Sequence, residues 1–130
     1  MYARVVTIHV RRDQIDECVR IFKEINAPSI ASHPGFDHGH WWLDRENGKA
    51  TSVTFWDTAD HERASRANIP RLIDGMAHVL STHDVEQESF ERVHDAYAAR
   101  ALEAHASPVR ASAPNPTTSG GIGTPLQSGS

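Results

Sequence analysis

The chain has 130 residues, of which 38% are hydrophobic and 23% are charged, and its formal net charge is −4. These values suit one modest soluble domain, and the lack of a Lys/Arg-rich run argues against nucleic-acid binding. No stretch approaches the roughly 18 consecutive apolar residues of a membrane span, and the alternating N-terminus does not resemble a secretory signal. A single cysteine, Cys18, excludes an internal disulfide. We therefore expect a cytoplasmic protein that binds neither nucleic acid nor membrane.

Residues 2–10, YARVVTIHV, are rich in β-branched side chains and are about as long as a strand. Alternation gives this strand two partly apolar faces: Val6, Ile8 and Val10 on one, and Val5, Thr7 and His9 on the other. The pattern predicts a strand that is covered on both sides.

An amphipathic helix is predicted next, with Asp13 as its N-terminal cap and Asp16 three residues later. Its apolar residues recur at three- and four-residue spacing: Ile15, Cys18, Val19, Phe22 and Ile25. Cys18 lies on this stripe, so we expect it to be buried and unreactive. Pro28 should end or kink the helix.

The segment HPGFDHGHWW, residues 33–42, predicts a turn followed by a strand. Along that strand His38, His40 and Trp42 share one face, whereas Trp41 points to the other. Asn47-Gly48 is a strong hairpin signal, and residues 51–56 are the returning strand.

A second helix is predicted after a cap at Asp57 or Thr58, with Pro70 dividing it and starting its second half. Its expected buried stripe is Ala64, Ala67, Leu72, Ile73, Met76, Ala77 and Leu80. Residues 85–93 have helical spacing, but a closing strand there completes a βαββαβ order. We predict a strand over 85–93, a short helix near 95–105 and an α+β ferredoxin-like fold.

Composition changes from Ser107 onward, where four of the seven prolines and four of the eight glycines are found. Too few apolar residues remain there to offset the entropy of an ordered chain. We therefore divide the chain into a folded domain, residues 1–105, and a disordered Pro/Gly/Ser-rich tail, residues 106–130.

Two segments, SHPGFDHG and TFWDTADHERAS, resemble the recurrent xxPGFxG and xxWxSxExxxA motifs of antibiotic biosynthesis monooxygenase (ABM) domains in the dimeric α/β-barrel superfamily. The resemblance covers about residues 2–94. It implies a homodimer in which two sheets close into one barrel. Members of this family include cofactor-independent monooxygenases, haem-degrading oxygenases and proteins without assigned activity.

The two histidines His38 and His40 leave three interpretations open. Their side chains project the same way about 7 Å apart, which suits a shared metal ion, but a catalytic metal needs a third protein ligand that the sequence does not fix nearby. A role in hydrogen bonding or acid–base chemistry and a purely structural role are the alternatives. No resident metal is expected.

Haem degradation, as the resemblance describes it, needs an asparagine on the first strand, a tryptophan ending the third and a histidine on the second helix. Trp56 matches the tryptophan and His78 is the candidate histidine, but the first strand offers Thr7 and His9 in place of asparagine. A haem cofactor is therefore the less favoured variant.

Cofactor-independent oxygenation of an aromatic or quinol-like molecule needs an apolar pocket, a base and exclusion of water. Our catalytic candidates are His9, His40, Trp56 and His78, and our substrate-binding candidates are His38, Trp42 and Asn68. The alternative is a non-catalytic dimer that binds a small ligand or haem.

The tail holds a further candidate, because residues 119–126, SGGIGTPL, resemble the peptides that load cargo into encapsulin shells. Two apolar anchors, Ile122 and Leu126, on a flexible tether suit docking into a shallow groove. The simpler alternative is a tail without a partner.

Removal of residues 107–130 should leave both the dimer and its melting temperature unchanged, because that segment is expected to contribute nothing to the core. Light scattering after size-exclusion chromatography and thermal unfolding measure the two quantities. A truncated chain that dissociates or unfolds would contradict the division into domain and tail.

Overall fold

A computed structural model describes residues 1–99 of the chain, which fall into two units, Met1–Arg92 and the segment from Val93. The first unit is a four-stranded antiparallel sheet in the order β2-β3-β1-β4. Its strands are β1 (Tyr2–His9), β2 (Phe36–Asp44), β3 (Lys49–Trp56) and β4 (Glu86–Glu91). Its helices are η1 (Arg12–Gln14), α1 (Ile15–Ile21), η2 (Phe22–Asn26), α2 (Ala27–Ala31), α3 (Ala59–Ser65), η3 (Arg66–Asn68) and α4 (Ile69–Asp74). The predicted ferredoxin-like βαββαβ order is confirmed.

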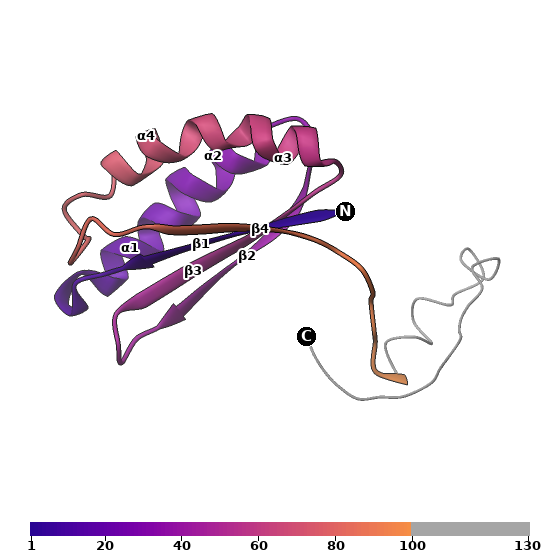
Figure 1. The fold of residues 1–130 in the computed structure, drawn as a ribbon. Coiled ribbons are helices and arrows are strands. Elements are labelled where there is room, and N and C mark those ends of the chain that lie inside the picture. The colour runs from indigo at the N-terminus through magenta and orange to yellow at the C-terminus, as the bar shows by residue number, and fades with distance from the viewer. Residues whose placement is uncertain (100–130) are drawn as a thin grey trace. The chain divides into compact units, whose positions relative to one another are not determined.

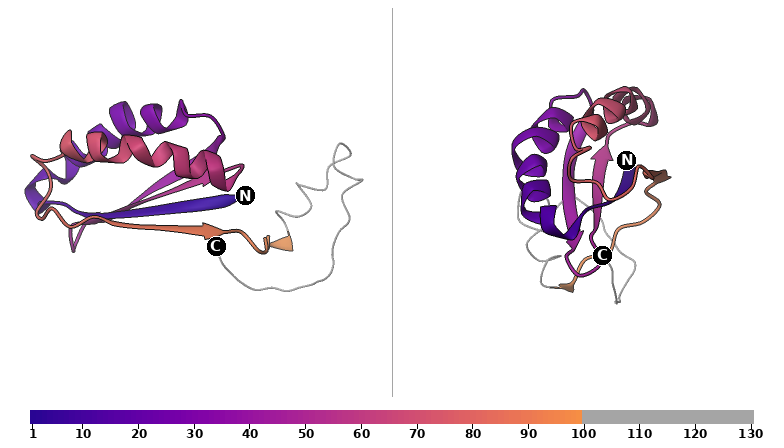
Figure 2. Two further views of the ribbon diagram at one scale, coloured as in Figure 1. Left: turned by 45° about the horizontal axis from the view of Figure 1, so that its top comes forward. Right: turned by 90° about the vertical axis from the view of Figure 1, so that its left-hand side faces the viewer.

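All the helices lie on one face of the sheet (Figure 1), and Figure 2 shows the two layers from the side. We call the covered side the inner face and the other the open face. On β1 the alternation places Arg4, Val6 and Ile8 on the inner face, with Thr7 and His9 on the open one. The predicted cover on both sides of this strand is therefore supplied by helices on one side only within the unit.

The first helical segment differs from its prediction at both ends. Asp13 lies inside the 3-10 turn η1 and makes no capping hydrogen bond, so the proposed cap at Asp13 is wrong. Ile25 is 48% exposed, whereas its neighbour Asn26 is buried. The physical reason is η2, a π-helical turn, whose extra residue moves the buried stripe on by one position. Pro28 lacks an N–H and lies in the first turn of α2, so the helix continues past it.

A β-bulge near the start of β2 determines which face of the sheet its first side chains occupy. The pairs Phe36–Trp56 and His38–Phe55 show that one residue of β2, Asp37, has no partner of its own on β3. Phe36 therefore enters the core while His38 reaches the open face, although two residues of an unbroken strand at this spacing share a face.

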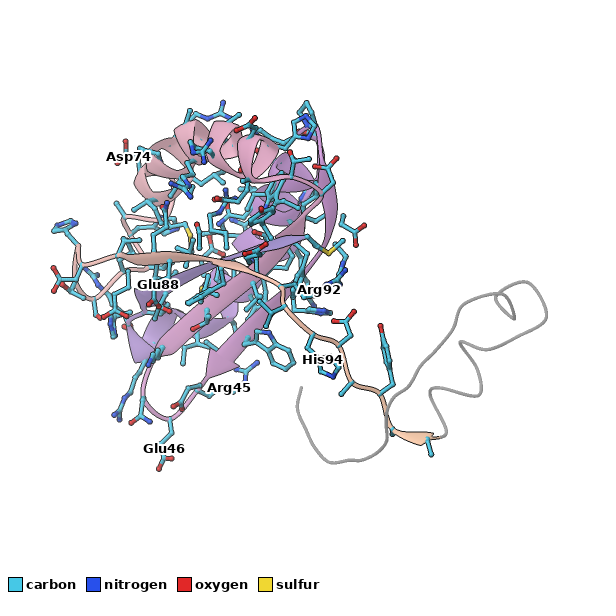
Figure 3. All side chains as sticks on the ribbon, turned by 45° about the vertical axis from the view of Figure 1, so that its right-hand side comes forward. Arg45, Glu46, Asp74, Glu88, Arg92 and His94 are labelled. Carbon is cyan, nitrogen blue, oxygen red and sulfur yellow. The ribbon has the colours of Figure 1, made fainter. Side chains whose placement is uncertain are left out.

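The predicted hairpin is confirmed between β2 and β3. Its connection is residues 45–48, with Arg45 and Glu46 at the tip (Figure 3), rather than a two-residue turn. The Asn47 backbone N–H and side-chain amide both donate to the Asp44 carboxylate, and Gly48 has a φ of 63°. Only glycine adopts that φ without strain, so this position ends the turn.

The second helical segment begins as predicted, because the Thr58 hydroxyl accepts a hydrogen bond from the His61 backbone N–H at 3.1 Å. Pro70 lies in the first turn of α4, also as predicted. Part of the expected stripe is wrong: Ala64, Ala67 and Ala77 are exposed, whereas Glu62, Ser65 and Val79 are buried. The 3-10 turn η3 and the end of α4 at Asp74 break the regular period on which the prediction rested.

The strand predicted near 85–93 is confirmed as β4, which pairs with β1. The helical propensity of this segment is overridden because the edge of β1 has N–H and C=O groups that need hydrogen-bond partners. The short helix expected near 95–105 does not begin at residue 95, since residues 93–98 have no regular secondary structure. The remainder of that helix, the predicted disorder of the tail and its residues 119–126 lie outside the described residues.

The main core lies between the helices and the inner face of the sheet. It contains Ile8, Val10, Ile15, Cys18, Ile21, Phe22, Ala50, Met76, Val79 and Leu80. Cys18 is fully buried, and burial raises the pKa of its thiol to about 11, so the thiol is not a nucleophile at neutral pH. Within residues 1–99 no helix is long and apolar enough to cross a bilayer.

Gly48→Ala should destabilise the fold by about 2 kcal/mol, because a Cβ at this φ would press on the backbone carbonyl of Val10. Gly75→Ala is the matched control, since the nearest atom to its added Cβ is 3.5 Å away. Chemical denaturation measures both changes. Equal free energies of unfolding for the two variants would contradict the strained role of Gly48.

Candidate functional site

An internal cavity of about 40 Å³ lies between the inner face of the sheet and the helices. We call it the inner cavity. Most of its walls are apolar, and the polar exceptions are Arg4, Asn26 and Ser52. Its apolar walls are Val6, Ile8, Phe22, Ile30, Trp41, Ala50, Ile69, Leu72, Ile73 and Met76. The volume is enough for a water-sized molecule or one small chemical group.

Arg4 is the charged residue of this wall and is 2% exposed. One terminal nitrogen, Nη1, donates to the Glu62 carbonyl at 3.2 Å, and it also contacts the Glu62 carboxylate and the Ser65 hydroxyl. Its Nε and Nη2 groups donate to no residue within 1–99. Burial lowers the pKa of Arg4, and Glu62 opposes that effect. Arg4 is therefore a buried cation in the cavity wall, with Nε and Nη2 donors that no residue within 1–99 accepts from.

Glu62, on α3, is shared between two guanidinium groups. Arg66 holds it through two hydrogen bonds, Nη2 to Oε1 at 2.5 Å and Nε to Oε2 at 2.8 Å, while Arg4 lies at 3.5 Å from Oε2. Burial by itself raises the pKa of Glu62, but the hydrogen bonds and charge of Arg66, together with Arg4, outweigh it and lower the pKa. One carboxylate between two cations leaves the cluster with one net positive charge.

Trp56 ends β3 beneath this cluster and is fully buried. Its ring centroid lies 5.0 Å from the Arg4 guanidinium carbon, a cation–π distance, and 5.5 Å from the Phe36 ring in an edge-to-face contact. The indole N–H donates to the Thr54 hydroxyl at 2.9 Å. Trp56 thus gives its ring face to Arg4, and its one N–H is already used within the fold.

A second hollow, which we call the outer cleft, opens beside α4 and β4 with a volume of about 470 Å³. Its walls are Arg66, Ile69, Pro70, Ile73, Asp74, Val85 and Gln87. Figure 3 shows Asp74 near the end of α4. Ile69 and Ile73 line both hollows, so these two side chains are the partition between the cleft and the inner cavity.

Among our candidate residues, Trp56, Asn68 and His78 belong to the helix side of the sheet or to the helical layer. The Asn68 amide donates to the Ser29 hydroxyl at 2.9 Å and accepts from Arg71, so it joins two helical segments. His78 is exposed, with Nε2 3.4 Å from a Glu17 carboxylate oxygen. None of these three residues lines the inner cavity.

The other four candidates, His9, His38, His40 and Trp42, lie on the open face, across the sheet from the cavity. The predicted shared face of His38, His40 and Trp42 is correct: His38 stacks on Phe55 at 4.4 Å, and the His40 and Trp42 rings lie 5.9 Å apart. Trp42 is 59% exposed. Within residues 1–99 no three His, Cys, Asp or Glu side chains gather as metal ligands.

None of the residues that line the inner cavity was among our candidates; Arg4, Asn26 and Trp41 are three of them that differ from an ordinary aliphatic wall. Arg4 stands two residues before Val6, so strand alternation already assigned it to the inner face, where an arginine needs an explanation. Trp41 is opposite in direction to Trp42, as predicted, and meets the cavity. Asn26, whose amide lies 3.2 Å from the Met76 sulfur, reaches the cavity only because of the π turn, for which the sequence has no clear signal.

Glu62→Gln should lower the free energy of unfolding by about 3 kcal/mol at neutral pH, because it leaves two arginines without their shared charge. Since the folded pKa of Glu62 is lowered, its contribution is present above the unfolded glutamate pKa of about 4.3 and is lost as pH falls through the folded value. The gap between the parent chain and the variant should therefore close in acid. Denaturation at several pH values measures it.

Asp60→Asn, on the same helix, is the control, because its ion pair with Arg63 is exposed. Its effect should be much smaller and should show little of the acid-dependent loss. An equal effect of the two substitutions would contradict the special role of the buried cluster.

The curated proteins that this chain resembles match it over only part of their own length. Two Mycobacterium tuberculosis proteins, from the CDC 1551 and H37Rv strains and both named as uncharacterised, are 25% identical to this chain over 95 residues. That alignment covers 72% of this chain and 42% of each relative. The chain thus spans less than half the length of the curated relatives it matches.

Several solved structures share the fold. A Deinococcus radiodurans protein assigned to the antibiotic biosynthesis monooxygenases has a TM-score of 0.63 at 16% identity, covering 75% of this chain and 98% of that one. HapK from Hahella chejuensis has a TM-score of 0.61 at 13% identity over 76% and 99% of the two chains. A mutant of SnoaB, a cofactor-independent oxygenase from Streptomyces nogalater, has 0.56 at 15% identity over 72% and 94%.

The family profile named "Antibiotic biosynthesis monooxygenase" matches residues 1–69, more than half of the chain. The match runs from β1 through α3 and into α4, and so includes Arg4, Trp56 and Glu62. The chain belongs to the antibiotic biosynthesis monooxygenase family.

Proposed function

We propose that this protein is a small monooxygenase that oxidises an aromatic or quinol-like molecule without a tightly bound cofactor. The observation that carries the proposal is the mostly apolar cavity beside a buried Arg4–Trp56 pair, in a chain of the antibiotic biosynthesis monooxygenase family. A cofactor-independent oxygenase among the proteins of the same fold supports the same chemistry.

The reaction asks little of the protein. An electron-rich phenol or hydroquinone, once deprotonated, passes an electron to O₂, and the two radicals combine on the ring. One oxygen atom ends on the substrate as a carbonyl, and the other leaves as water with one hydrogen from that ring carbon and one from the phenolic hydroxyl. The protein contributes position, an apolar setting and exclusion of water.

In this proposal the outer cleft receives the aromatic ring and the inner cavity receives its ionised hydroxyl oxygen. Pockets for small molecules commonly measure about 300–1,000 Å³, a range that includes the cleft and not the cavity. Trp56 fixes the electrostatics at the inner end through Arg4, which makes it a positioning residue. Asn68 positions the start of α4 and its cavity side chain Ile69 through Ser29.

We propose that two copies associate through their open faces, as is typical of the family. The open face supports this assignment because it presents large apolar groups, with Trp42 59% and Phe90 51% exposed. His9, His38 and His40 then lie at the subunit interface rather than at the substrate, and a proton-transfer role for them needs a route across it.

A non-catalytic, ligand-binding dimer is the second candidate, and one observation favours it. The walls of the inner cavity contain no His, Asp or Glu, so no general base lines it. Haem gains no support, because the candidate ligand His78 is exposed beside Glu17 and the cavity is far smaller than a porphyrin.

Oxygen consumption with 1,4-dihydroxynaphthalene tests the enzyme, measured against spontaneous oxidation in protein-free buffer. Ile73→Trp fills the partition between cleft and cavity and should reduce the protein-dependent rate at least tenfold. Ile25→Trp, at an exposed position, is the matched control and should leave the rate unchanged.

No protein-dependent consumption across a panel of phenols and hydroquinones would reject the monooxygenase and favour the binding protein. A rate that Ile73→Trp and Ile25→Trp lower equally would place the reaction elsewhere on the chain.

A further inference from the structure

We propose that Arg4 binds the oxyanion of an aromatic acid or phenol. The acidic oxygen enters the inner cavity and the ring stays in the outer cleft, beyond Ile69 and Ile73. The inference deepens the proposed function, since it names the ligand class of the same site, but it requires binding only and no turnover.

The first support is the pattern of donors on Arg4. A guanidinium has five N–H groups, and in this one a single nitrogen, Nη1, makes every hydrogen bond to residues 1–99. Nε and Nη2 are adjacent and form the edge of the guanidinium that carboxylates bind with two parallel hydrogen bonds. Buried donors without partners cost free energy, so a ligand that supplies two acceptor oxygens gains two hydrogen bonds that residues 1–99 do not make.

The second support is the charge of the cluster. Arg4 and Arg66 share the single carboxylate of Glu62, and one positive charge remains. Arg4 lines the inner cavity and Arg66 lines the outer cleft, so both hollows border this excess. Asp74 is the acidic group of the cleft wall and is exposed, where solvent screens it. The electrostatics therefore favour an anion at the inner end.

The third support is size. A volume of about 40 Å³ accommodates one polar head group and no aromatic ring, whereas the adjoining cleft has room for a ring system. The apolar residues Ile69 and Ile73 between them suit the ring edge. A neutral amide of the same shape offers one acceptor oxygen and places an NH₂ donor where the carboxylate has its second oxygen, so discrimination between ion and neutral isostere should be large.

The test compares 2-naphthoate with 2-naphthamide by isothermal titration calorimetry on the full chain, because the pair differs in charge and hardly in shape. The parent protein should bind the carboxylate at least tenfold more tightly than the amide. Arg4→Met should weaken the carboxylate at least tenfold and the amide less than threefold. Arg63→Met, an exposed arginine on α3, is the control and should change neither.

Arg4→Lys keeps the charge and guards against a variant that merely fails to fold. It should retain part of the preference for the carboxylate, and circular dichroism reports its fold and that of Arg4→Met. For the phenol source, 2-naphthol should bind more tightly as pH rises through the ionisation of its own hydroxyl, and this gain should vanish in Arg4→Met.

Position is tested separately. Ile73→Trp should abolish naphthoate binding, whereas Trp42→Ala on the open face should leave it intact. Equal affinity for acid and amide, no binding of naphthoate by the parent chain, or equal losses in Arg4→Met and Arg63→Met would each overturn the proposal.

The outcomes separate this inference from the proposed function. Arg4-dependent naphthoate binding without oxygen consumption supports the anion site and rejects the monooxygenase. Oxygen consumption that survives Arg4→Met with an unchanged KM for the hydroquinone supports the monooxygenase and rejects the anion site.

Discussion

The buried guanidinium of Arg4 is the constraint around which the helix side of the sheet is arranged. It lies on the central strand β1, packs on Trp56 of β3 and binds Glu62 and Ser65 of α3. A cation at 2% exposure is tolerated only if its charge is paired, and the partners of Nη1 come from the residues of α3 that turn inward. That is why Glu62 and Ser65 are buried while the alanines Ala64 and Ala67, better suited to a core by hydropathy, face solvent.

The order of elements could be predicted from the sequence because it rests on local signals. Thr58 as a cap, Pro70 as the first turn of α4 and glycine at 48 each act within a few residues. The strand at 86–91 needed a non-local argument, namely that a closing strand completes the βαββαβ order, and in the structure it pairs with the edge of β1. Its own propensity favours a helix, and the pairing overrides it.

The candidate site was predicted less well, and the failures have physical causes. A search for histidines found side chains on the open face, because sequence spacing shows which residues share a face but not which face meets the helices. Asn26 depends on the π turn η2, which shifts the buried stripe by one residue. Arg4 could have been predicted to point inward, because it alternates with Val6 and Ile8. The role of an inward arginine becomes clear only when its partner Glu62, 58 residues away, is known.

The two faces of the sheet therefore differ. The inner face carries Arg4, the open face carries exposed aromatic side chains, and β1 contributes residues to both. Successive residues of β1 from Ala3 to Ile8 point alternately to the inner face, which carries Arg4, and to the aromatic open face. A slip of one residue in the pairing of β1 with β3 would exchange Arg4 for a small or apolar neighbour and send its charge to the open face. Either burying that charge unpaired or losing its ion pair with Glu62 would cost free energy. The register of β1 therefore determines both the cavity wall and the apolar open face. Arg4 is accordingly held in place by the sheet, whereas Ile69 and Ile73, the side chains that separate the cavity from the cleft, belong to the helical layer.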